Sequence, residues 1–403
     1  MLLAAALLSF IASALAGARK LWMRGLFFNL APAMGAAFYV VSFIPKTHPN
    51  SLDLASALIF EFVFLIVFYK VLALVFLEMS KVDEDDAVKV LKWAMLLHLL
   101  TVLPNIGAAG FGIFSQGSRI DYLFDNRFAK YLTYGGIIIS IIEATFLARL
   151  LSIQGKISSI SIFVFSLNFT LSVLSGSKGA VFLWIAALLS LIDYRSFRFD
   201  IFRILILSAV GLASLYFSAL IVANFSNLDL AEFFDLAISR FFLYNDARAL
   251  ALDLRPIYYV DSALFSESFR SLAGLFGAAP QNEPLGILLY RQAFFTDGVS
   301  GANASLMALV VYYTAPGYSI LPILIATSGL FLVFYVSKKS LIFFQDAKSR
   351  LIVITFWTGA IMNYSQDFLA FQVFVIITLA LIIFLFIIRP KSSFSSGSYE
   401  YAR

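Results

Sequence analysis

The sequence predicts an all-α, polytopic integral membrane protein. Apolar residues make up 61% of the chain and charged residues only 13%, whereas a soluble domain is about half apolar and a quarter charged. The mean hydropathy is +0.91, and long apolar segments recur along the whole chain. Because a water-facing surface needs polar cover that this composition does not supply, it excludes a soluble enzyme, a disordered chain and a nucleic-acid-binding protein.

Apolar segments long enough to cross a bilayer predict about 11 transmembrane helices, since a helical span needs about 20 mostly apolar residues. The predicted spans are 2–18, 25–44, 52–77, 93–114, 131–150, 157–175, 178–193, 201–223, 317–337, 350–363 and 367–388. Residues 303–337 are too long for one crossing at roughly 1.5 Å per residue, and Pro316-Gly317 divides them. We therefore expect 303–314 to form a half-helix or a re-entrant segment.

The lysines and arginines predict the orientation, because short cytoplasmic loops carry an excess of them. Alternate loops and the C-terminal tail hold 18 of these residues, while the short loops on the other side hold five. This bias places the N-terminus outside and the C-terminus in the cytoplasm. The first apolar segment has Arg19, Lys20 and Arg24 after it and no basic residue before it, which favours a retained anchor over a cleaved signal peptide.

The polar material is organised around one long outer loop. Residues 1–403 read as a single integral membrane domain, with a large periplasmic loop that contains helices at 224–302 and a short cytoplasmic tail at 392–403. The chain contains no GxxxxGK[ST] motif for a nucleotide, no cysteine, and only two histidines, His48 and His98, without metal-ligand spacing. We therefore expect chemistry without nucleotide, metal or other cofactor.

An arginine stripe marks the first part of the outer loop. At 100° per residue, Arg240, Arg248 and Arg255 fall within about 80° of a helix surface, and Asp246 and Asp253 point roughly the opposite way. Guanidinium groups in such a row can hold a planar anion by paired N–H donors. Each of these arginines could equally well contact a lipid headgroup or a neighbouring carboxylate.

Further outer segments offer groups for the same site. Tyr258 and Tyr259 follow the stripe, and aromatic rings suit either sugar stacking or a membrane surface. Arg119 lies in a compact loop, and Lys178 lies in a tight Ser175–Gly179 turn before a helix. A helix N-terminus with a cation is a seat for phosphate, although the same pattern occurs in ordinary turns.

Three ionisable residues lie deep in predicted spans, where charges are costly and commonly functional. These are Glu61, His98 and Glu143. For all three, hydrogen bonding between helices is the more common role. Lys70 lies near the inner end of its span, where its long side chain can reach the interface.

Three local patterns resemble the O-antigen (oligosaccharide repeat-unit) polymerases, the Wzy-type membrane glycosyltransferases related to the O-antigen ligases. The segment 174–180 (LSGSKGA) is similar to the family's SGSRGA-like turn, with lysine in place of arginine. The arginines and tyrosines of 240–259 occupy the place of the family's functional loop arginines. The run from Asn303 to Tyr313, followed by Ala315-Pro316-Gly317, resembles the family's small-residue helix. Residues 224–302 contain no histidine, unlike the large loop of the ligases, which favours a polymerase.

The resemblance implies that a polyprenyl-pyrophosphate-linked oligosaccharide is the substrate, at the outer face of the bacterial inner membrane. The growing chain would pass from its lipid pyrophosphate to an incoming repeat unit, as in the synthesis of O-antigen and lipopolysaccharide. The candidate catalytic residues are Arg240, Arg248, Arg255, Arg291 and Asp246, with Asp253, Asp261 and Glu61 as alternative bases. The candidate substrate-binding residues are Lys178, Arg119, Tyr258, Tyr259, Asn303 and Tyr313. Membrane lipid and a chain-length regulator protein are the other partners to expect, with no nucleic acid.

The main alternative is a lipid-linked oligosaccharide flippase or another polytopic transporter. Such a protein is expected to carry internal repeats with paired broken helices. The chain has one Pro-Gly break, at 316–317, and the nearest counterpart in the first half is Pro104. A long outer loop with an arginine stripe fits catalysis better than alternating access.

Overall fold

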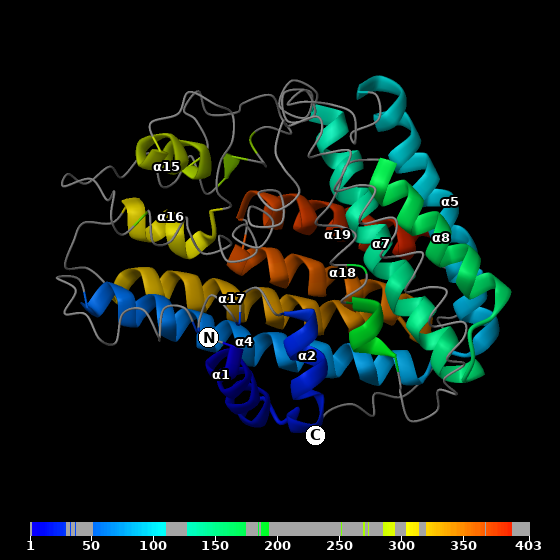
Figure 1. The fold of residues 1–403 in the computed structure, drawn as a ribbon, viewed down its shortest axis with the longest axis horizontal. Coiled ribbons are helices and arrows are strands. Elements are labelled where there is room, and N and C mark those ends of the chain that lie inside the picture. The colour runs from blue at the N-terminus through cyan, green and yellow to red at the C-terminus, as the bar shows by residue number, and fades with distance from the viewer. Residues whose placement is uncertain are drawn as a thin grey trace, which may run out of the picture.

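The structure is a computed structural model that describes residues 2–29, 33, 37, 51–109, 127–174, 184, 187–192, 251, 269–270, 273, 285–294, 304–313, 320–366 and 368–388. Within these residues every regular secondary-structure element is a helix, which confirms the all-α class (Figure 1). They are α1 (Leu2–Leu15), η1 (Arg19–Leu21), α2 (Trp22–Phe28), α4 (Ser51–Ser80), α5 (Glu84–Ala109), α7 (Arg127–Gln154), α8 (Ser159–Leu174), α15 (Leu285–Phe294), α16 (Leu306–Tyr313), α17 (Ile320–Ser340), η3 (Leu341–Phe343), α18 (Ala347–Gln366) and α19 (Phe368–Ile388).

Several of these helices are long and apolar enough to cross a membrane. The described residues contain five such segments, which are Leu58–Ser80, Glu84–Gly107, Gly135–Gln154, Ile323–Phe343 and Ala370–Ile387. Leu3–Leu15 and Ser159–Leu171 are shorter apolar helices. The predicted span 201–223 lies outside the described residues, as does the tail 392–403, and the predicted spans 25–44 and 178–193 and the loop 224–302 are described only in part.

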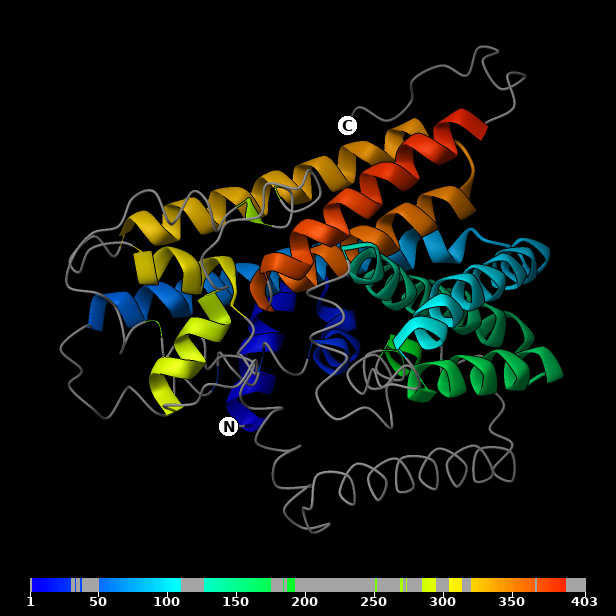
Figure 2. The ribbon, with the colours of Figure 1, turned by 90° about the horizontal axis from the view of Figure 1, so that it is seen from above.

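The helices form two groups that meet at α7. In Figure 1, α4, α17, α18 and α19 lie alongside one another, while α5, α7 and α8 run across their ends, and Figure 2 shows the same two groups from above. Helix α7 packs against α5 and α8 on one side and against α18 and α19 on the other. Of the apolar segment of α7 that could cross a membrane, 83% is buried inside the protein. Helix α7 is therefore the helix that joins the two groups.

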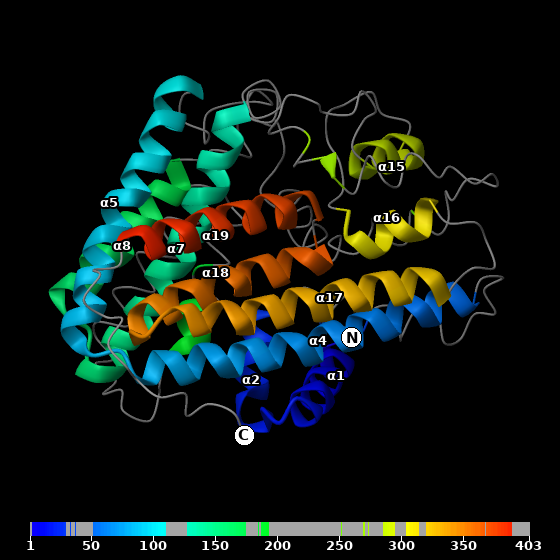
Figure 3. The same cartoon turned by 180° about the vertical axis from the view of Figure 1, so that it is seen from behind.

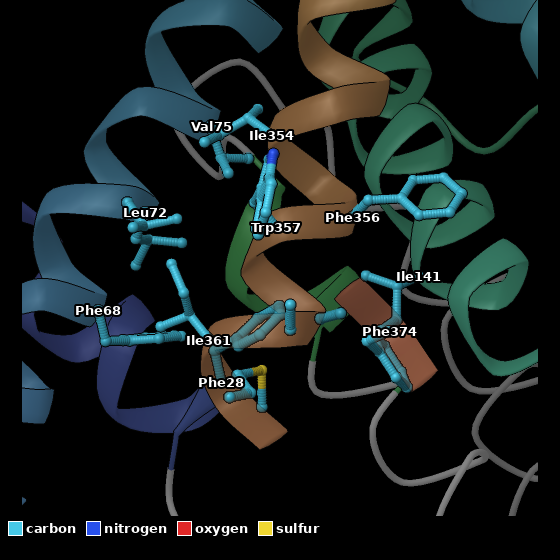
Figure 4. Close-up of a cluster of buried hydrophobic side chains, with 14 of the residues drawn as sticks. Phe28, Phe68, Leu72, Val75, Ile141, Ile354, Phe356, Trp357, Ile361 and Phe374 are labelled. Carbon is cyan, nitrogen blue, oxygen red and sulfur yellow. The ribbon is translucent and has the colours of Figure 1, made fainter. Parts of the chain in front are cut away.

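Helix α18 is the centre of the first group. Trp357 and Ile361 of α18 lie among Phe68 and Leu72 of α4, and Phe374 of α19 lies nearby (Figure 4). Within lipid there is little hydrophobic driving force between helices, so close van der Waals packing of this kind holds them together. Helix α18 is thus an interior helix, which fits the polar residues in its sequence.

A glycine in the left-handed conformation ends α1. Gly17 has φ +72°, and the amides of Gly17 and Ala18 donate to the carbonyls of Ala14 and Ser13. This pair of bonds satisfies the last carbonyls of α1. It ends the helix at Leu15, earlier than the predicted 2–18.

A glycine also permits the close packing of α2 against α4. A Cβ added at Gly25 would lie 2.1 Å from Cε1 of Tyr69, a ring that is fully buried. The Tyr69 hydroxyl donates to the Trp22 carbonyl at 2.7 Å and contacts the Ser9 hydroxyl. The ring therefore joins α1, α2 and α4.

Replacing Gly25 with alanine is expected to lower the melting temperature of the purified protein in detergent. The added methyl must displace a buried ring, and overpacking of this kind costs about 1–3 kcal/mol. The matched control is Gly107→Ala in α5, where nothing lies within 4 Å of an added Cβ. The control should be neutral or stabilising, since alanine favours a helix by about 0.5–1 kcal/mol over glycine. Equal melting temperatures for the two variants would contradict this packing.

Candidate functional site

A pair of ionisable side chains connects α5 and α7 in the middle of the bundle. Nδ1 of His98 lies 3.0 Å from Oε2 of Glu143, and the two side chains are only 3% and 1% exposed. Hydrogen bonding between helices, the more common role expected from the sequence for each of these residues, is confirmed for His98 and Glu143, although the sequence did not predict that they pair with each other. A charge in this environment is stabilised only if its partner lies within the protein.

Two neighbouring glycines of α7 lie against α5 beside this pair. A Cβ added at Gly136 would lie 3.4 Å from Oγ1 of Thr101 and 4.0 Å from Cδ2 of His98. One at Gly135 would lie 3.9 Å from Cγ2 of Thr101. An added Cβ at either position would make ordinary van der Waals contact, so the two glycines lie at the α5–α7 interface beside the pair, where small residues are common.

Helix α8 completes the cluster with an amide. Nδ2 of Asn168 donates to Oε2 of Glu143 and to Oγ of Ser140, at 3.2 Å. Asn168 is 1% exposed and Ser140 is 2% exposed. Sequence reasoning missed these two residues, although an asparagine in an otherwise apolar helix is a signal that could have found them.

Glu61 lies on a different helix. Its side chain is fully buried in α4, and the neighbouring ring of Phe60 packs against Tyr364 of α18, with 6.2 Å between the ring centroids. Glu61 therefore lies at the level where α18 ends. It is a second deep carboxyl group, on the side of the bundle formed by α4 and α18.

Charged side chains gather at one end of the bundle, where α4 and α7 end and α5 and α18 begin. We call this the basic end. Nε of Arg350 donates to Glu78 at 2.7 Å, and Lys81 pairs with the other oxygen of Glu78 at 2.8 Å. Arg149 donates to the carbonyls of Val82 and Ser80. Three basic loops that are distant in the sequence thus meet at one end.

Two further residues belong to the basic end. The guanidinium of Arg24 lies 5.0 Å from the ring centroid of Phe76, near the end of α4. Nζ of Lys348 donates to Asp86 at 2.9 Å, and this hydrogen bond raises the pKa of Lys348. The pKa of Lys348 is raised only in the folded state. The pair therefore stabilises the fold fully at pH values below the ordinary pKa of lysine, and this stabilisation is lost as the pH rises through the raised pKa.

The two described members of the predicted site lie at the opposite end. Arg291 is in the last turn of α15, and Tyr313 is the last residue of α16, buried against Tyr312 with 5.0 Å between the ring centroids. Helices α15 and α16 both lie at this end of the molecule in all three ribbon views (Figures 1, 2 and 3). The other predicted site residues lie outside the described residues, and they are Arg119, Lys178, Arg240, Asp246, Arg248, Arg255, Tyr258, Tyr259 and Asn303.

Helix α16 is a short helix with a fixed start. The Ala308 amide donates to the Ser305 hydroxyl at 3.1 Å, which caps the helix. The Phe368 amide donates to the Ala304 carbonyl at 2.9 Å, which fixes this start to the turn between α18 and α19. The 8 residues of α16 span roughly 12 Å, a length that agrees with the half-helix predicted at 303–314.

The fold defines an all-helical protein whose described residues contain five helices long and apolar enough to cross a membrane, with a buried polar cluster between three of its helices. No protein-family model matches the chain, and no curated protein or solved structure matches it. Among the residues that the structure describes, no group of three or more histidine, aspartate or glutamate side chains is placed to hold a metal ion.

The Arg350→Gln variant is expected to melt at a lower temperature than the wild type. It removes a donor from Glu78, whose side chain is only 7% exposed, and a buried charged group that loses a partner costs about 1–3 kcal/mol. The control is Lys338→Gln, at an exposed lysine in the last turn of α17, and it should leave the melting temperature unchanged. Thermal unfolding in detergent measures both. If both substitutions had the same small effect, the basic end would not stabilise the bundle.

Proposed function

We propose that this chain is a membrane glycosyltransferase that polymerises polyprenyl-pyrophosphate-linked oligosaccharide repeat units into a surface polysaccharide such as O-antigen. The observation that carries the proposal is the position of α15 and α16, across the bundle from the basic end (Figure 3). These helices bear Arg291 and Tyr313, two residues of the predicted site. The resemblance of three sequence patterns to the polymerases supports the same activity.

In this proposal the basic end faces the cytoplasm. Positive residues are retained on the cytoplasmic side during insertion, so α15, α16 and the loop 224–302 face the periplasm. The chain would lie in the bacterial inner membrane with about 11 spans, its N-terminus in the periplasm and its C-terminus in the cytoplasm. A lipid-linked substrate in the outer leaflet would then reach the arginines without crossing the membrane.

The proposed reaction needs charge stabilisation and a base. An acceptor hydroxyl attacks the anomeric carbon of the growing chain, the bond to the lipid pyrophosphate breaks, and the hydroxyl proton passes to a carboxylate. Negative charge gathers on the leaving pyrophosphate, where Arg240, Arg248, Arg255 and Arg291 would stabilise it through fixed N–H donors. Asp246, Asp253 and Asp261 are the candidates for the base.

Transport of a lipid-linked oligosaccharide or another substrate is the second candidate, and the His98–Glu143 pair favours it, because ionisable residues inside a membrane often mark an ion or proton path. A transporter built from repeats is expected to have paired broken helices. Helix α16 is one short helix, but α5 continues through Pro104 from Glu84 to Ala109. The nearest counterpart in the first half is therefore an unbroken helix, which favours the polymerase.

The proposed orientation predicts which cysteines an impermeant thiol reagent can reach. The chain has no native cysteine, so Leu250→Cys in the large loop and Ile342→Cys at the basic end can be studied one at a time. Position 342 is exposed in the structure. Intact cells or spheroplasts should label at position 250 only, and opened membranes at both. Labelling of position 342 from the outside would contradict the orientation.

Replacing Arg291 with alanine is expected to abolish long surface polysaccharide and leave single repeat units attached. Arg291→Lys should also impair polymerisation, because one ammonium does not reproduce the paired donors of a guanidinium. Gel analysis of the polysaccharide ladder in a strain that depends on this chain measures both effects. Arg19→Ala, at the exposed first residue of η1, is the matched control and should retain the ladder. Chains of normal length from both Arg291 variants would contradict the proposed role of this residue.

A further inference from the structure

We propose that His98 and Glu143 form a proton-binding site inside the membrane, with a route for the proton along the interface between α5 and α7. The ligand is one proton, held by an imidazolium next to a carboxylate. This inference does not depend on the proposed polymerase activity, which uses residues at the periplasmic end. It assigns a role to the buried pair that glycosyl transfer leaves unused.

The hydrogen bonds fix where the proton resides. Oε2 of Glu143 faces two nitrogens, Nδ1 of His98 at 3.0 Å and Nδ2 of Asn168. An oxygen that accepts two N–H groups is stabilised as a carboxylate. Asn168 supplies one donor and the Nδ1–H of His98 supplies the other. These bonds place a hydrogen on Nδ1, and the charge balance of the pair decides whether Nε2 carries a second one.

Charge balance gives the proton its place in the site. With one proton, the imidazolium and the carboxylate cancel each other. If the proton is absent, the buried carboxylate of Glu143 carries an uncompensated negative charge. If a second proton binds, the buried imidazolium of His98 carries an uncompensated positive charge. Either uncompensated charge costs several kcal/mol. Oε1 of Glu143 is buried and has no hydrogen-bond partner among the described residues, so the rest of the site offers this carboxylate little further compensation.

The other helices packed against α7 contribute few groups that could take over this role. The described residues of α8 and α19 include no ionisable side chain. On α18, Tyr364 donates to the Ala326 carbonyl of α17, and Lys348 and Arg350 are bound at the basic end. The remaining groups on the packed elements are Asp53, Glu61, Tyr69, Lys70 and Glu78 of α4, Glu84, Asp85, Asp86, Lys89 and Lys92 of α5, and Arg127, Lys130, Tyr131, Tyr134 and Arg149 of α7.

None of the ionisable groups that are bound elsewhere in the structure competes for Glu143. Glu78 and Arg149 are committed to the basic end, and Tyr69 is bound to Trp22. Lys92, the nearest lysine of α5 in sequence, is exposed and lies six residues, or roughly 9 Å along the axis, from His98. His98 is therefore the cation that faces the carboxylate.

Polar side chains lead from the pair toward the end where α5 finishes and α7 begins. His98, Thr101 and Asn105 recur at three and four residues, which places them on one face of α5. Nδ2 of Asn105 donates to Oγ1 of Thr133 on α7 at 3.0 Å. Thr101, Asn105 and Thr133 are half-buried, whereas His98 is buried. This row of hydroxyl and amide groups is the proposed route, and it opens away from the basic end.

Nitrogen-15 NMR of the histidine ring tests the proton site directly. The chain has two histidines, so a His48→Gln background leaves His98 as the only signal in labelled protein. At pH 7 both ring nitrogens of His98 should carry hydrogen, and in Glu143→Gln, which removes the compensating charge, only one should. A neutral ring in both proteins, or a charged ring in both, would overturn the proposal. Circular dichroism and gel filtration select folded samples, and if Glu143→Gln does not fold, Asn168→Leu is used, for which the proposal predicts that the imidazolium persists.

The route is tested by the rate at which the His98 ring exchanges its hydrogen with deuterated solvent. Thr101→Val and Thr133→Val remove hydroxyls from the proposed route and should slow the exchange several-fold. The matched control is Thr145→Val on α7. The Thr145 hydroxyl donates to the Ile141 carbonyl of its own helix, just as the Thr101 hydroxyl donates to the His98 carbonyl at 2.9 Å, but Thr145 is not part of the proposed route. The control should exchange at the wild-type rate. Equal rates in all three variants would contradict the route.

Discussion

The structure depends on one constraint, which is that a polar group removed from water must find its partner inside the protein. Helices satisfy the backbone in this way, since each amide bonds within its own segment. The side chains follow the same rule. The carboxylate of Glu143 is enclosed by His98 and Asn168 from two other helices, and this polar contact holds together helices that apolar side chains alone would leave free to slide.

The same constraint separates the charges of the chain into two kinds. Most described charges lie at the basic end, where Glu78 and Arg350 bring α4 and α18 together and Arg149 fastens the end of α7 to the turn after α4. The few that lie deep, His98, Glu143 and Glu61, are almost completely buried. Placing charge in the interior is costly, so the deep groups are the ones that call for a functional explanation. The basic end explains orientation and stability.

Much of the fold could be predicted from the sequence because apolar length and charge position are local properties. The spans predicted at 52–77 and 131–150 each lie within a helix of the structure, and the span predicted at 367–388 matches α19 to within one residue. The polar residues from Asn363 to Gln366, predicted as a break, form the last turn of α18. Pro316-Gly317 indicated that the preceding segment is separate, and the short α16 agrees with this. Helix ends were harder to predict, because the stop at Gly17 depends on the left-handed conformation of that glycine.

The polar cluster could be predicted only in part. The sequence showed that His98 and Glu143 are deep, but their pairing depends on how α5 and α7 pack against each other in the folded structure. Asn168 joins them from α8, a helix whose facing surface no local pattern reveals. Of the predicted periplasmic site, Arg291 and Tyr313 are on helices at the same end of the molecule, while the arginine stripe at 240–255 stays a prediction.

The measurement that tests the proposed function most directly is reconstitution of the purified chain in liposomes with a defined polyprenyl-pyrophosphate oligosaccharide, without nucleotide or metal. Product analysis by gel electrophoresis or mass spectrometry should show a ladder of lipid-linked chains that grow by whole repeat units, with release of polyprenyl pyrophosphate. If the active preparation moved the oligosaccharide lipid between leaflets and formed no longer chain, the chain would be a transporter and the polymerase proposal would be wrong.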